Sequence, residues 1–123
     1  MSGLFGAINP ATGEKISEYQ YTSDTELHRI VERSFKAYEV QKATDYKERA
    51  AKLKKLADLL EERVDEYAKL ITDMMGKPLS ASKQEVEKSA KHARFYASKA
   101  EEYLTPKPVK TEAKSSYVRY EPL

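Results

Sequence analysis

The chain has 123 residues, of which 22 are Lys or Arg and 20 are Asp or Glu, giving a net charge of +2. This length fits a single domain with a modest core, and so small a charge argues against a nucleic-acid or other polyanionic partner. There is no cysteine, which excludes disulfides, Cys–metal sites and thiol catalysis within these residues.

The N-terminal stretch MSGLFGAINPATG has no basic region before an apolar run, so it does not resemble a signal peptide. No apolar run in the chain approaches the roughly 18 residues that a membrane-spanning helix needs. We therefore expect a cytoplasmic location and no membrane partner.

The first predicted elements are a turn and a strand. Asn9-Pro10 and Thr12-Gly13 are dipeptides that favour turns. The residues that follow are rich in strand formers and alternate roughly between polar and apolar types, which predicts one strand near residues 15–21.

An amphipathic helix is predicted next. Ser23 and Glu26 have the spacing of a capping box, in which each side chain bonds the other residue's backbone N–H. The helix should end near residues 41–43. Its apolar face is formed by Leu27, Ile30, Val31, Phe35 and Tyr38.

A long helical segment should follow, capped by Thr44 or Asp45 and ended by Gly76, with Pro78 close behind. A break is possible near residues 63–65, because Asp65 could cap a new start. The apolar stripe of this segment is Leu53, Leu56, Ala57, Leu60, Val64, Tyr67 and Ile71.

The last predicted helix begins at Ser80 or Ser82, because residues 82–85 form a second capping-box pattern. Small residues dominate its stripe and would let a neighbouring element approach closely. The stripe is Val86, Ala90, Ala93, Ala97, Ala100 and Leu104. Pro106 and Pro108 stop this helix.

Residues 116–120 form a second predicted strand, which meets Pro122 and Leu123. The expected fold is therefore mainly α, with three to four helices and short flanking strands. An isolated pair of strands is marginally stable in water. The two strands must pair with each other or with polypeptide outside this sequence.

Candidate catalytic groups are sparse. His28 and His92 are far apart and lack metal-ligand spacing, so we interpret them as surface or packing residues. The pairs Glu61-Glu62, Asp65-Glu66 and Glu101-Glu102 lie among lysines at helical spacing, which predicts ion pairs within each helix. We find no phosphate-binding glycine motif. The residues alone predict no catalytic, cofactor-binding or metal site.

Three segments nevertheless combine in a familiar order. They are INPATGEKISEY, then RAAKLKKLADLLEERVDEYAKLITDMMGKPLSAS, then RFYASKAEEYL leading to SSYVRYEPL. Together they resemble the N-terminal part of an NAD(P)-dependent aldehyde dehydrogenase, and the succinate-semialdehyde dehydrogenase branch looks most similar.

The resemblance implies an N-terminal part of an α/β fold. Residues 1–104 would form the helical part of the cofactor-binding domain, and residues 105–123 a linker and the first strand of an oligomerisation flap. Two turns are matched, at Asn9, Pro10 and Gly13 and at Gly76, Lys77 and Pro78. The matched flap strand is Tyr117, Val118, Arg119 and Tyr120.

The family's chemistry uses a cysteine thiolate, a glutamate and an asparagine, and the resemblance maps all three beyond Leu123. It therefore implies that NAD or NADP serves the full-length enzyme, that this segment binds no cofactor, and that the chain alone is inactive. Its expected partners are the missing C-terminal part of the enzyme and further copies of the chain, through exposed helix faces and strand edges. The alternative is a free-standing helical module for self-association or partner binding.

Overall fold

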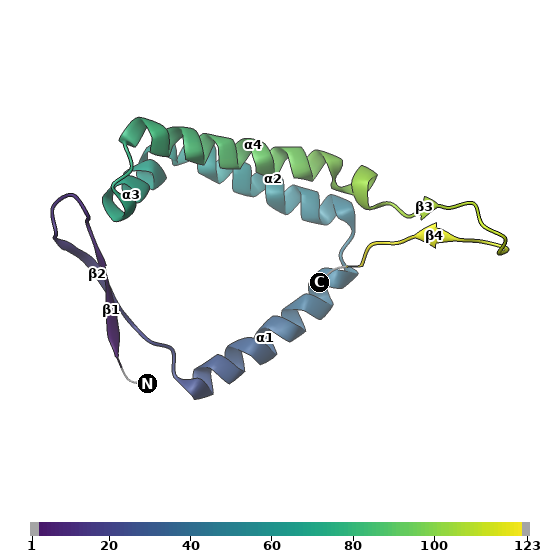
Figure 1. The fold of residues 1–123 in the computed structure, drawn as a ribbon, viewed down its shortest axis with the longest axis horizontal. Coiled ribbons are helices and arrows are strands. Elements are labelled where there is room, and N and C mark those ends of the chain that lie inside the picture. Colours follow the sequence, from purple (N-terminus) through teal and green to yellow (C-terminus); the bar gives the residue numbers. More distant parts are fainter. Residues whose placement is uncertain (1–2, 122–123) are drawn as a thin grey trace.

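The computed structural model describes residues 3–121 and contains four helices and two small antiparallel sheets (Figure 1). The predicted mainly α fold with short flanking strands is confirmed. Pro122 and Leu123, which follow the second predicted strand, lie outside the described residues.

Helix α1 covers Asp24–Ala43 and begins and ends where the sequence predicts. The Ser23 hydroxyl accepts a hydrogen bond from the backbone N–H of Glu26 at 3.2 Å, which is one half of the predicted capping box. The Glu26 carboxylate is bound instead by Arg33, at 3.2 Å, and lies 3.6 Å from Arg29.

Helices α2 (Tyr46–Glu62) and α3 (Val64–Met75) arise from one predicted segment that breaks at Arg63. Asp45 caps α2 by accepting the N–H of Glu48 at 2.7 Å. Gly76 ends α3 in the left-handed region at φ 69°, which a glycine adopts without a steric penalty. The break and the two outer boundaries are as predicted. Asp65 does not cap α3, however, because it lies in the first turn and Arg63 stands at the N-cap position without a side-chain cap.

Helix α4 covers Leu79–Leu104, so the predicted start at Ser80 or Ser82 is wrong. Pro78 stands at the N-cap position, and no side chain caps the helix there. Ser82 consequently lies inside the helix. It is fully buried, and its hydroxyl is 3.0 Å from that of Thr72 on α3.

The core of the molecule lies where α2 and α3 pack against α4. Its members are small, as the alanine-rich stripe predicts: Ala57, Ala68, Ser82, Val86 and Ala90. Small side chains let helix backbones approach closely, at the cost of burying little apolar area.

The strands form two hairpins, so neither predicted strand is unpaired. β1 (Leu4–Ile8), which the sequence analysis missed, pairs with β2 (Lys15–Gln20), and the rings of Phe5 and Tyr19 stack at 5.4 Å. β3 (Lys107–Pro108) pairs with β4 (Tyr117–Val118). Within residues 3–121, no helix is long and apolar enough to cross a membrane.

Candidate functional site

The titratable side chains do not form a catalytic cluster. No three of the described His, Asp and Glu residues are grouped so that they could hold a metal ion. His28 lies on α1 and His92 on α4, and both are exposed, in agreement with the prediction of surface histidines.

Two of the predicted carboxylate pairs act between helices, contrary to our expectation of ion pairs within each helix. Arg94 on α4 donates to both oxygens of Glu61, at 3.1 and 2.5 Å, and to Asp58 at 2.7 Å. Asp65 on α3 likewise pairs with Lys83 on α4, at 2.5 Å. Only Glu102 pairs within its helix as predicted, with Lys99 at 2.7 Å.

The pairing with Arg94 holds the Glu61 carboxylate in its charged form. The hydrogen bond from Arg94 lowers the pKa of Glu61, and the hydrogen bond to Glu102 raises the pKa of Lys99. A general acid needs the opposite shift, towards a neutral carboxyl at neutral pH. Glu61 is therefore a structural contact between α2 and α4 rather than a candidate general acid.

The two predicted turns meet in space. The Asn9 carboxamide oxygen accepts the N–H groups of Ala11 at 2.9 Å and Thr12 at 3.3 Å, and Gly13 completes the turn at φ 77°. The ring of Pro10 lies against Gly76, where an added Cβ would be only 3.1 Å from its Cγ. The first hairpin is thus attached to the α3–α4 turn, whose Lys77 pairs with Glu85.

The predicted flap strand is only partly regular. Tyr117 and Val118 pair with Pro108 and Lys107, whereas Arg119 and Tyr120 follow β4 as irregular chain. The β3–β4 hairpin projects from the helices (Figure 1). Arg119 forms an ion pair with Glu121 at 2.5 Å.

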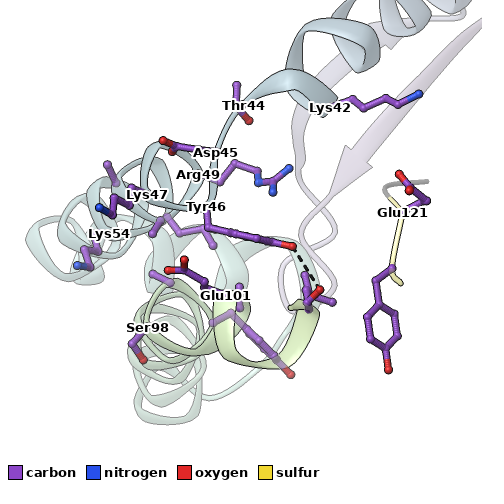
Figure 2. A pocket seen from close by; sticks show the side chains of 18 of the residues that line it. Lys42, Thr44, Asp45, Tyr46, Lys47, Arg49, Lys54, Ser98, Glu101 and Glu121 are labelled. Carbon is purple, nitrogen blue, oxygen red and sulfur yellow. Dashed lines mark hydrogen bonds between the residues drawn. The ribbon is translucent and has the colours of Figure 1, made fainter. Parts of the chain in front are cut away.

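An open groove of about 1050 Å³ lies between the start of α2, the end of α4 and residues 119–121. Figure 2 shows Tyr46 inside it, with its hydroxyl donating to the carbonyl of Leu104 at 3.4 Å. The Arg49 guanidinium lies 4.9 Å from the centre of the Tyr46 ring. The sequence analysis did not find this groove, because its walls come from three distant segments.

The groove has the character of a binding surface rather than a reaction centre. Its walls combine apolar side chains with charged ones that reach solvent, among them Lys42, Lys47, Lys54 and Glu101 (Figure 2). These four groups are all exposed, whereas catalytic acids and bases are typically held in partly buried settings.

The sequence profile of the aldehyde dehydrogenase family matches residues 2–123. This chain belongs to the aldehyde dehydrogenase family. It is 39% identical, over 116 residues, to a probable NADP(+) succinate-semialdehyde dehydrogenase of Synechocystis, and 38% identical, over 120 residues, to the succinate-semialdehyde dehydrogenase of Mycobacterium avium. These alignments cover 94% of this chain but only 26% and 25% of the two relatives.

Solved aldehyde dehydrogenases have the same arrangement of elements. The structure of Gox0499 superposes with a TM-score of 0.92 at 26% identity, covering 98% of this chain and 26% of that one. Succinic semialdehyde dehydrogenase from Streptococcus pyogenes, solved with NADP+, gives 0.86 at 32% identity, covering 92% and 25%. The chain thus corresponds to the N-terminal quarter of an aldehyde dehydrogenase.

Proposed function

We propose that this chain supplies the outer helical part of the cofactor-binding domain of an aldehyde dehydrogenase, through residues 1–104, and the start of its oligomerisation flap, through residues 105–123. The enzyme would oxidise succinate semialdehyde to the acid with NADP or NAD. The observation that carries this proposal is the 39% identity to the Synechocystis relative across 94% of the chain.

The sequence and the structure favour a role for this chain that is not catalytic. The chain has no cysteine, so a thiolate nucleophile would have to come from polypeptide beyond these residues. Dinucleotide phosphates typically bind at a glycine-rich turn that opens a helix. The α3–α4 turn has a single glycine, Gly76, and the ring of Pro10 lies beside it.

A chimera tests the proposal. This chain would replace the matching N-terminal quarter of the Synechocystis relative, and absorbance of the reduced cofactor would be followed with NADP+ and succinate semialdehyde. We expect turnover by the chimera and none by this chain alone or by the relative without its first quarter.

Two outcomes would contradict the proposal. One is turnover by the pure 123-residue chain, which would place an active site within it. The other is a folded chimera that oxidises no aldehyde. Propanal serves as the matched substrate control, because it lacks the carboxylate of succinate semialdehyde and separates the general activity from the proposed substrate.

The alternative of a free-standing self-association module is favoured by one observation, the uncovered apolar face of α1. It concerns what this chain does by itself and is compatible with family membership.

A further inference from the structure

We draw no further inference here: the strongest candidate, the open groove between the start of α2, the end of α4 and residues 119–121, lies in a chain that spans about a quarter of the length of its relatives, and nothing in the structure shows what covers it.

Discussion

Arg94 joins α4 to α2 through side-chain hydrogen bonds. Its guanidinium contacts Asp58 and Glu61, which stand three residues apart and therefore on one face of α2. Arginine suits this position because its planar fork can bind two carboxylates at once, which the single ammonium group of a lysine does less well. All three side chains reach solvent, so the contribution to stability is small and sensitive to salt.

The Arg94–Glu61 contact predicts a dependence of stability on pH. Arg94 lowers the pKa of Glu61 below its reference value of 4.5 in the folded chain. A lowered pKa means that the unfolded chain binds the proton more readily, so the stabilisation is present above pH 4.5 and is lost as the pH falls through the folded-state pKa. Urea unfolding should be measured between pH 6 and pH 3. Over this range the free energy of unfolding should fall less for Glu61→Gln than for the wild type.

The control for this measurement is Glu62→Gln, which removes the adjacent exposed carboxylate. That variant should keep the wild-type pH dependence. The free energy of unfolding could instead fall by the same amount in Glu61→Gln and in the wild type between pH 6 and pH 3. That result would show that Arg94 does not stabilise the charged form of Glu61.

At the scale of elements, the sequence predicts those helix boundaries that depend on interactions between neighbouring residues. The ends of α1 and the Asp45 cap follow from capping side chains and apolar spacing, which act within a few residues. The break at Arg63 lies where the sequence predicts it, although no side chain caps the start of α3. The start of α4 was misassigned because Ser82 satisfies a capping pattern, although Pro78 starts the helix earlier and Ser82 is used against Thr72 on α3. That contact is tertiary and leaves no local signal.

Strand β1 and the groove around Tyr46 were both missed because they depend on contacts between segments that are distant in the sequence or separated by a turn. β1 contains Gly6 and only five residues, and it becomes a strand because β2 pairs with it across the turn at Asn9. The groove around Tyr46 is likewise a product of helix packing, because residues of α2, α4 and the chain after β4 meet only in the folded molecule. The pattern of apolar and polar residues within one segment does not reveal which other segment it pairs with or packs against.

The contact between the two turns gives a prediction at this scale. Gly76→Ala adds a Cβ at φ 69°, a strained conformation for alanine, and places it 3.1 Å from the Pro10 ring. We expect a loss of more than about 1 kcal/mol in unfolding free energy. Gly13→Ala is the matched control, because its φ is 77° but nothing lies within 4 Å of an added Cβ.

The difference in unfolding free energy between Gly76→Ala and Gly13→Ala measures the effect of the contact with the first hairpin. Adding Pro10→Ala to Gly76→Ala should recover part of the loss, since the ring that the new methyl group meets is gone. If Gly76→Ala and Gly13→Ala lower the free energy of unfolding in urea by the same amount, the first hairpin does not contact the α3–α4 turn.

At the scale of the whole molecule, burial is unevenly distributed. The residues that are fully or almost fully buried lie in α2, α3 and α4, whereas α1 and both hairpins bury none. Large apolar side chains remain exposed on all of these outer elements, including Phe5, Phe35 and Tyr117. A surface of this kind needs cover from further protein, which is consistent with a chain that spans about a quarter of the length of its relatives.

This uneven burial predicts an order of local stability that hydrogen exchange can measure. Amide protection follows buried contacts, so in dilute solution the amides of α2 and α4 should exchange slowly and those of α1 quickly. Protection of α1 equal to that of α4 in the most dilute sample would mean that α1 is already covered within one chain.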